Sequence, residues 1–554
     1  MSKRRYAGRL PRRLSAMWIR PFGTWVVAAV AVFLVTLQLT IGVSGASPLW
    51  GKLIPGPHAV GFRAIEKYDY SRTYQPKRDY FGAALPGERA RPLQICMWYP
   101  GRPKAGAGPV VLNEYNFVTP EDAEFYQILG GLQNREIAVL FPALGNDMDA
   151  VLQALAIEMT AVKNADPAGG AFPLIIYQGD LNTGLVENAV MCEYLASHGF
   201  VVAAAQAPGP AALRSEPNAS SLEIMAEDMG FVLAALRDFD FIDRARVGVL
   251  GYRAGSVAAM LLQMRNFDID AAALVEYPLG DSEIGQAAAR NPHYDVVRAT
   301  VPLLFLYSAP EDDRDKAVLE PFKYSSRWWL RFGSPEVVGL TTYGLLPAAM
   351  IGGAAPPAEG SPRPAEGSPS PADTYEAACR YVLHFFAGHL NGSAESLAFL
   401  GRPPAENGLA PGLASAGKMD AVERPPTQDE FMAMLDQGKV DVATGLYEKF
   451  KSLDSATPFF AEAAMNVMGY RHLQRGMAQE AIAIFKMNAD AHPGSANCWD
   501  SLAEAYMASG DSTHALECVQ KVIEVLPNDT NLTENLRQAI QTNVEHYMQM
   551  LKPE

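Results

Sequence analysis

The sequence predicts an α/β protein with a doubly wound, mostly parallel sheet, followed by a smaller all-helical region. Short apolar runs alternate with helical segments from about residue 172, and such runs are typical of parallel strands that are covered by helices on both faces. A 34-residue repeat marks the C-terminal part. Hydrophobic residues make up 49% of the 554 residues and charged residues 19%, a balance that indicates a globular chain.

Residues 1–46 predict an export signal or a membrane anchor. They contain seven Lys and Arg and no acidic residue, and residues 24–42 form an uncharged, mostly apolar run. Nineteen residues in a helix come close to the thickness of a hydrocarbon core. Basic residues before the run would keep that end in the cytoplasm, so we expect a periplasmic or otherwise extracytoplasmic body. Ser44, Gly45 and Ala46 are compatible with cleavage, so a removed signal and a retained anchor both stay open.

The charge balance excludes one class of partner. The chain has 46 Lys and Arg against 61 Asp and Glu, a formal net charge of −15. Nucleic-acid binding needs an excess of basic residues, so we expect no nucleic-acid partner. The five cysteines form no CxxC pair, which argues against a disulfide scaffold and a zinc module. We expect neither a metal nor a cofactor.

The central region is expected to supply the sheet. We predict strands at residues 173–177, 200–206, 246–252, 271–276, 301–307 and 337–343. We predict helices at residues 188–198, 221–239 and 254–264. Residues 113–166 precede the first of these strands, and we predict that they form a helical insertion that covers a pocket as a lid.

Two segments rich in Pro, Gly, Ala and Ser are predicted to be flexible. Residues 352–373 contain the sequence PAEGSP twice, and residues 401–427 have a similar composition. Neither segment can bury enough apolar surface to offset the entropy lost on ordering. The first interrupts a domain, because helical sequence resumes at Thr374. The second is predicted to link this domain to a helical domain at residues 428–554.

The C-terminal repeat has the pattern of paired antiparallel helices. Four residues recur after 34 positions: Gly469, Gly476, Ala481 and Pro493 as Ala503, Gly510, Ala515 and Pro527. The small residues let two helices approach closely, the glycine closes the turn, and the proline ends the second helix. This pattern resembles the tetratricopeptide repeat, with Phe485 at its aromatic position and Val519 in the second copy. The resemblance implies a groove for a protein or peptide; a structural cap or a dimer surface is an equally open interpretation.

The end of the strand at residues 246–252 resembles a catalytic turn. The sequence from Gly251 to Gly255 has the shape of the nucleophile elbow G-x-S-x-G. Residues 173–184 (PLIIYQGDLNTG) resemble an oxyanion-loop strand, and residues 192–204 (CEYLASHGFVVAA) resemble the helix and strand that follow it. Together they resemble the platelet-activating-factor acetylhydrolase and dienelactone-hydrolase-like esterases. The resemblance implies an α/β-hydrolase domain at residues 47–400.

This resemblance also implies where a catalytic site would lie. Arg253 stands at the nucleophile position, Glu276 at the position of the acid, and Tyr343 nearest the position of the histidine. The oxyanion and pocket positions fall on Gln178, Gly179, Asp180 and Ala254. A guanidinium has no lone pair for attack, and Ser256 would face another direction on the first helical turn. We therefore expect a degenerate site.

Arg253 needs a partner if it is buried. We hypothesise an ion pair with Glu276, because an unpaired buried guanidinium costs several kcal/mol. If the guanidinium has no carboxylate partner, the pocket becomes an anion site for a carboxylate, a phosphate or a lipid headgroup.

The function that we expect is that of an exported, catalytically inactive α/β-hydrolase with a helical-repeat docking domain. It would bind a small ligand in the pocket, a protein or peptide at the repeats, and the membrane through residues 24–42 if they are retained. Two alternatives stay open. One is a divergent esterase that hydrolyses carboxylic or phospholipid acyl esters, and the other is a repeat-based assembly scaffold.

Overall fold

The computed structural model describes residues 46–79, 81–209, 214–278, 282–308, 317–333, 337–346, 370–453 and 460–551. The predicted signal or anchor at residues 24–42 lies outside these ranges, as does most of the Pro-rich segment, residues 352–369. Within the described ranges, every helix is too short or too polar to cross a lipid bilayer.

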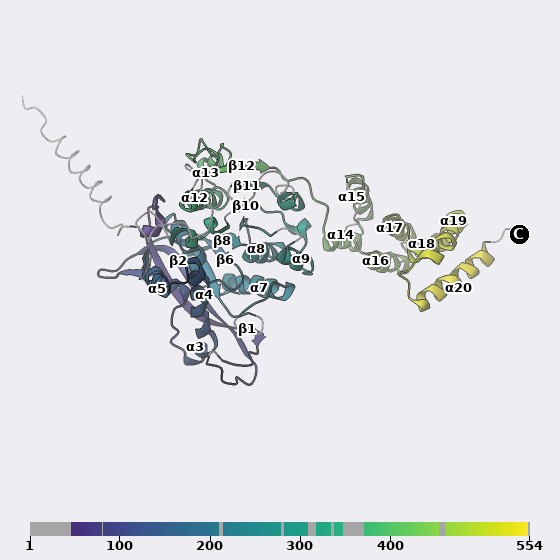
Figure 1. Cartoon of the computed structure of the whole chain (residues 1–554). Helices are drawn as coiled ribbons and strands as arrows, with labels where there is room; N and C mark the ends of the chain where they lie inside the picture. Colours follow the sequence, from purple (N-terminus) through teal and green to yellow (C-terminus); the bar gives the residue numbers. More distant parts are fainter. Residues whose placement is uncertain are drawn as a thin grey trace, which may run out of the picture.

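One large mixed sheet forms the centre of the larger body that precedes the C-terminal helices (Figure 1). From one edge to the other its strands are β12 (Ala414–Met419), β11 (Arg327–Phe332), β10 (Leu303–Ser308), β9 (Ala271–Val275), β8 (Ile242–Tyr252), β6 (Phe172–Gln178), β7 (Val201–Gln206), β2 (Arg89–Arg102), β1 (Ala59–Tyr74), β4 (Glu158–Lys163) and β3 (Pro109–Val111). The six strands β7, β6, β8, β9, β10 and β11 run parallel to one another, whereas β2 is antiparallel to both β1 and β7. A short strand, β5 (Asp166–Pro167), pairs with β2.

Helices cover both faces of this sheet, which makes it doubly wound. Among the described residues up to 400, the α-helices are α2 (Asn113–Asn116), α3 (Ala123–Leu129), α4 (Asn134–Ala143), α5 (Met148–Leu155), α6 (Ala189–Ser197), α7 (Ala219–Ala235), α8 (Ala254–Arg265), α9 (Glu283–Ala289), α12 (Pro371–Leu390) and α13 (Ala394–Leu400). Helices α6 and α12 share one apolar core with the sheet, and α7 and α8 share the core on its other face. Alternate residues of β6 enter opposite cores, since Ile175 belongs to the first and Leu174 to the second. The predicted α/β-hydrolase fold class is confirmed by this strand order and layering.

The last predicted strand was misplaced. Residues 337–343 form two short 3-10 helices, η6 (Val337–Leu340) and η7 (Thr342–Leu345), instead of a strand. The strand beside β10 is β11, whose sequence RWWLRF carries two arginines and so does not read as an apolar run. Arg327 is nevertheless buried, because its guanidinium donates to the carbonyl oxygens of Leu319 and Asp420.

The prediction of a flexible linker at residues 401–427 is wrong for its centre. Residues Ala414–Met419 form β12, which pairs antiparallel with β11 along the edge of the sheet. Gly417 packs on the ring of Trp329, where a Cβ atom would lie 2.6 Å from the ring. Composition alone missed this strand, because its order comes from backbone pairing with β11 and not from a run of large apolar side chains.

The insertion at residues 113–166 is only partly helical. Helices α2 to α5 occupy most of it, but β4 joins the sheet by parallel pairing with β1. Helix α4 carries Arg135 and Glu136 toward the loop that follows β6. That this segment acts as a lid stays a prediction.

The C-terminal region is entirely helical among its described residues (Figure 1). Its helices are α14 (Gln428–Asp436), α15 (Val440–Leu453), α16 (Glu462–Gln474), α17 (Ala478–Ala491), α18 (Ala496–Ser509), α19 (Ser512–Val525) and α20 (Glu534–Met550). Helices α18 and α19 each begin 34 residues after α16 and α17, in step with the sequence repeat. Gly476 and Gly510 close the two turns with φ of 75° and 82°, a left-handed conformation that favours glycine.

Candidate functional site

The turn between β8 and α8 keeps the geometry of a nucleophile elbow. Arg253, at its apex, has φ 48° and ψ −113°, a conformation that costs a non-glycine residue about 1–3 kcal/mol. Gly251 and Gly255 on either side cannot carry a side chain. A Cβ atom on Gly251 would overlap the backbone of Ser256, and one on Gly255 would overlap the Gln178 carbonyl. The chain therefore retains the strained turn with an arginine where the attacking group would stand.

Arg253 pairs with Asp180 and not with Glu276. Its Nε lies 3.0 Å from Asp180 Oδ2, so the predicted ion pair with Glu276 is wrong. The Arg253 side chain is 46% exposed, and an ion pair this open to solvent contributes at most about 1 kcal/mol. The alternative of an anion site around a guanidinium without a carboxylate partner is not what the structure shows either, because Asp180 already supplies an anion.

Asp180 also lies at the position where the resemblance places the oxyanion hole. Its Oδ1 accepts hydrogen bonds from the backbone N–H of Ala254 at 3.2 Å and of Leu181 at 2.9 Å. The N–H after the nucleophile is one of the donors that would stabilise a tetrahedral intermediate in this fold. Burial raises the pKa of the Asp180 carboxyl, and the Arg253 guanidinium and the two N–H groups oppose that rise. A carboxylate of the chain itself therefore takes the place of the oxyanion.

Glu276 lies where the resemblance places the acid, directly after β9. It is buried with φ 51°, its N–H donates to the Leu306 carbonyl, and its Oε1 accepts from the Ser308 N–H at 2.6 Å. This backbone hydrogen bond ties Glu276 to the end of β10. The structure thus places the carboxylate at the expected strand end, held by β10.

Tyr343 belongs to a different set of contacts from Arg253. It lies in η7, is buried, and its hydroxyl donates to Glu136 Oε2 at 2.7 Å. The two histidines of α12 make packing contacts with aromatic rings. His384 stacks on Phe399 with ring centroids 3.8 Å apart, and His389 packs on Phe385. Ser256 is buried and donates its hydroxyl to the Arg253 carbonyl, so it presents no nucleophile at the surface.

Sequence reasoning missed two carboxyl groups of the site. Glu187, in the 3-10 helix η3 (Leu185–Asn188), is buried, and its Oε2 accepts from the Tyr177 hydroxyl and the Asp180 N–H, both at 3.0 Å. Burial raises the pKa of Glu187 to about 8, helped by the Asp180 charge. Burial also raises the pKa of Glu136 to about 7, against the hydrogen bond from Tyr343. Glu187 precedes an apolar helix in the sequence, whereas nothing in the sequence singles out Glu136.

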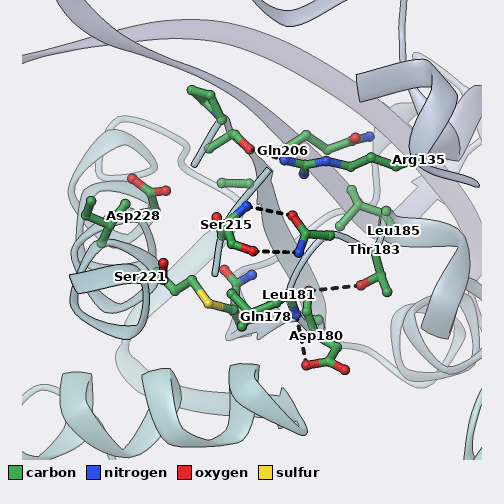
Figure 2. A pocket seen from close by; sticks show the side chains of 18 of the residues that line it. Arg135, Gln178, Asp180, Leu181, Thr183, Leu185, Gln206, Ser215, Ser221 and Asp228 are labelled. Atoms are coloured by element: carbon green, nitrogen blue, oxygen red, sulfur yellow. Dashed lines mark hydrogen bonds between the residues drawn. The ribbon is translucent and has the colours of Figure 1, made fainter. Parts of the chain in front are cut away.

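The cavity of this region runs along the loop after β6 and not above Arg253 (Figure 2). Its volume is about 50 Å³, far below the roughly 300–1,000 Å³ of ordinary ligand pockets. Gln178, Gly179 and Asp180 line it, whereas Ala254 does not. Asn182 closes one side, because its amide exchanges two hydrogen bonds with the backbone of Ser215. A space this small and polar suits a few water molecules. Within the described ranges, no three His, Cys, Asp or Glu side chains converge as metal ligands.

The likenesses to known proteins that the comparisons show are partial. No family model matches the chain. Over 62 residues, 11% of this chain, it is 39% identical to Superkiller complex protein 3 of Mus musculus, and it spans only 4% of that protein's length. Among solved structures, a ferulic acid esterase from Streptomyces cinnamoneus is similar with a TM-score of 0.43 and 20% identity, over 68% of this chain and 99% of the esterase. The fold assignment rests on the strand order and pairing described above.

Proposed function

We propose that this chain is a pseudo-hydrolase: an α/β-hydrolase body without ester-hydrolysing activity, joined to a docking module of the tetratricopeptide type. The observation that carries the proposal is the position of the Asp180 carboxylate, which accepts the Ala254 N–H beside an arginine at the nucleophile position. The docking module carries the interaction with a protein or peptide partner.

The chemistry of the elbow supports the loss of activity in two independent ways. Arg253 cannot form an acyl-enzyme, since its guanidinium only donates hydrogen bonds. An oxyanion formed next to Ala254 would meet the Asp180 carboxylate instead of a vacant donor. Removing a single oxyanion-hole donor already costs roughly 10²–10³ in rate. A negative charge at that place would cost more, because it repels the charge that develops in the transition state.

The helical region offers the larger binding surface. A groove of about 670 Å³ lies between α16, α18 and α20. Its lining includes Ala463, Asn466, Val467, Tyr470, Arg471, Asn497 and Leu536. Val467 and Leu536 are exposed there, and paired apolar and amide side chains suit a peptide that has both apolar residues and a polar backbone. The contrast with the 50 Å³ cavity favours a macromolecular partner at this groove over a small ligand beside Gln178.

The proposal also includes export of the body of the protein across the cytoplasmic membrane. Seven basic residues before the apolar run at residues 24–42 favour a body on the far side of the cytoplasmic membrane. In that setting the hydrolase body would act as a carrier that holds the docking module outside the membrane.

An active-site-directed fluorophosphonate probe tests the loss of activity. We expect no stoichiometric labelling of the native protein or of an Arg253→Ser variant, because the restored hydroxyl would still lack a base and a vacant oxyanion donor. Heat-denatured protein and an active serine esterase serve as the two controls. Stoichiometric labelling together with burst hydrolysis of an ester, lost on mutation of one Ser, Thr or Cys, would establish the divergent esterase instead.

Affinity capture from an extract of the source organism tests the docking module. Val467→Glu and Leu536→Glu should each reduce recovery of the bound protein, since both place a charge in the groove. Ile523→Glu is the matched control, because Ile523 is similarly exposed on α19 but does not line the groove. Equal loss with the control variant would count against the groove.

A further inference from the structure

The loop that carries Asp180 packs against two buried carboxyl groups from different parts of the chain. We define the site loop as residues 179–188, which includes η3. Glu187, within it, receives the Asp180 N–H, and Glu136, on α4, packs against Gly184 so closely that a Cβ atom there would overlap its Oε1. Both side chains are 2% exposed or less.

The burial of these two carboxyl groups disfavours their ionised forms. Glu136 Oε1 is buried and accepts no hydrogen bond of good geometry within the described part of the chain, although the backbone N–H groups of Gly184 and Val186 favour the charged form and lower the pKa of Glu136 without offsetting burial. A buried carboxylate oxygen without a donor is costly, whereas the neutral acid is tolerated. Glu187 lies beside the Asp180 carboxylate, so its ionisation would place two like charges in one buried space.

The surroundings hold more acidic than basic groups. Among the described residues, the titratable and charged groups that act on Glu136 and Glu187, besides each other, are Tyr177 on β6, Tyr252 on β8, Tyr343 on η7, Asp180 in the loop and Arg135 on α4. Arg253 forms an ion pair with Asp180 through its Nε. Arg135, next to Glu136 in the sequence, favours the charged form but does not outweigh burial.

We propose that Glu136 and Glu187 form a proton-linked latch on the site loop, which holds Asp180 against Ala254 while both carboxyls are neutral and loosens when they ionise. In the closed state the neutral acids fit a dry space. Ionisation draws water to both groups, and the site loop must open to admit it. Opening would move Asp180 away from Ala254 and enlarge the cavity beside Gln178. This inference does not depend on whether the protein hydrolyses esters.

The direction of the pH response follows from linkage. Both folded pKa values, about 7 and about 8, lie above the usual 4.5. The closed state is therefore fully favoured below about pH 4.5 and loses stability as the pH rises through 7 and 8, after which the effect levels off. Each carboxyl contributes up to about a tenfold change in the opening equilibrium per pH unit inside that window.

Hydrogen–deuterium exchange of the full chain tests the latch. Protection of peptides that cover residues 179–188, corrected for the intrinsic pH dependence of exchange, should fall between pH 5 and pH 8. Glu187→Gln and Glu136→Gln, which mimic the neutral acids, should keep the loop protected at pH 8. Glu193→Gln is the matched control: Glu193 is also a buried carboxyl with a raised pKa, but it holds Trp50 and Tyr115 instead of the site loop.

A second measurement covers the case in which a variant is too unstable to compare. Infrared difference spectra of the unmutated protein between pH 6 and pH 9 should show the loss of a protonated-carboxyl band. Loop protection that does not change with pH in the unmutated protein overturns the latch. So does a Glu187→Gln variant whose loop responds to pH as the unmutated protein does, or a spectrum without a protonated carboxyl at pH 6.

Discussion

The Cα atom of Gly255 lies against the carbonyl group of Gln178, so that a Cβ atom at position 255 would overlap the Gln178 oxygen. This contact joins the first turn of α8 to the end of β6, and it brings Asp180 within reach of Ala254. Gly255→Ala should therefore lower the free energy of unfolding by about 1–3 kcal/mol or more, because backbone cannot yield as a flexible side chain can. Chemical denaturation measures the difference.

Gly230→Ala is the matched control for this substitution. Gly230 lies within α7, and a Cβ atom there would make ordinary contact with Leu262 at 3.5 Å. Alanine is a better helix former than glycine, so this variant should be neutral or more stable by up to about 1 kcal/mol. Similar losses at both positions would contradict the close approach at Gly255.

Arg253 is strained, and its ion pair is weak. Because φ at this position is 48°, Arg253→Gly should be more stable than Arg253→Ala by about 1 kcal/mol, although both variants lose the contact with Asp180. Thermal unfolding of the two variants side by side isolates the backbone contribution. Equal stabilities would mean that the turn relaxes once the guanidinium is gone.

The two repeats fill the equivalent helix–helix contact with different pairs of side chains. In the first, Gly469 faces Phe485, and a Cβ atom would lie 2.5 Å from its ring; in the second, Ala503 and Val519 hold the matching positions. Gly469→Ala alone should destabilise by about 1–3 kcal/mol through overpacking. Adding Phe485→Val should recover part of that loss, so the pair should deviate from additivity by at least about 0.5 kcal/mol.

The cycle has a built-in control, since Phe485→Val alone should also be destabilising by leaving a cavity beside Gly469. Strict additivity of the two single changes in a denaturation experiment would show that the ring and the glycine do not depend on each other.

The buried carboxyl of Asp500 should make the stability of the helical region depend on pH. Burial raises its pKa to about 6, against a hydrogen bond from Asn543, which joins α18 to α20. Because the folded pKa is raised, the contribution of Asp500 is fully present below about pH 3.8 and is lost as the pH rises through about 6. Asp500→Asn should therefore stabilise α20 above pH 6, with little effect near pH 4, in exchange measurements on residues 534–550.

Glu430, in the same helical region, has a pKa that is shifted in the opposite direction from that of Asp500. Its pKa is lowered to about 2 by the hydrogen bonds from Arg424. Glu430→Gln should thus cost stability above about pH 4.5, and this difference should vanish as the pH falls toward 2. Its effect will be small, since the Glu430 side chain is 44% exposed and solvent screens the pair. A pH profile of the same sign for both variants would contradict these assignments.

Much of this architecture is readable from the order of residues alone. Buried parallel strands need apolar runs, so β6 to β10 stand out in the sequence, and helices that pack in pairs need small residues at a regular spacing, so the 34-residue period is visible as well. The substitution at Arg253 is equally plain, because the flanking glycines mark the turn. These features depend on neighbours along the chain.

Contacts between distant segments were decided only by the folded chain. The partner of Arg253 is Asp180 and not Glu276, because the loop after β6 folds back over the start of α8. Glu136 meets the site loop across an intervening stretch of chain that contains β4 and β6. Strand β12 is ordered by pairing with the backbone of β11, and the residues of β12 do not by themselves predict a strand. In each case the energy comes from burial or pairing against a surface that does not exist until the sheet has formed.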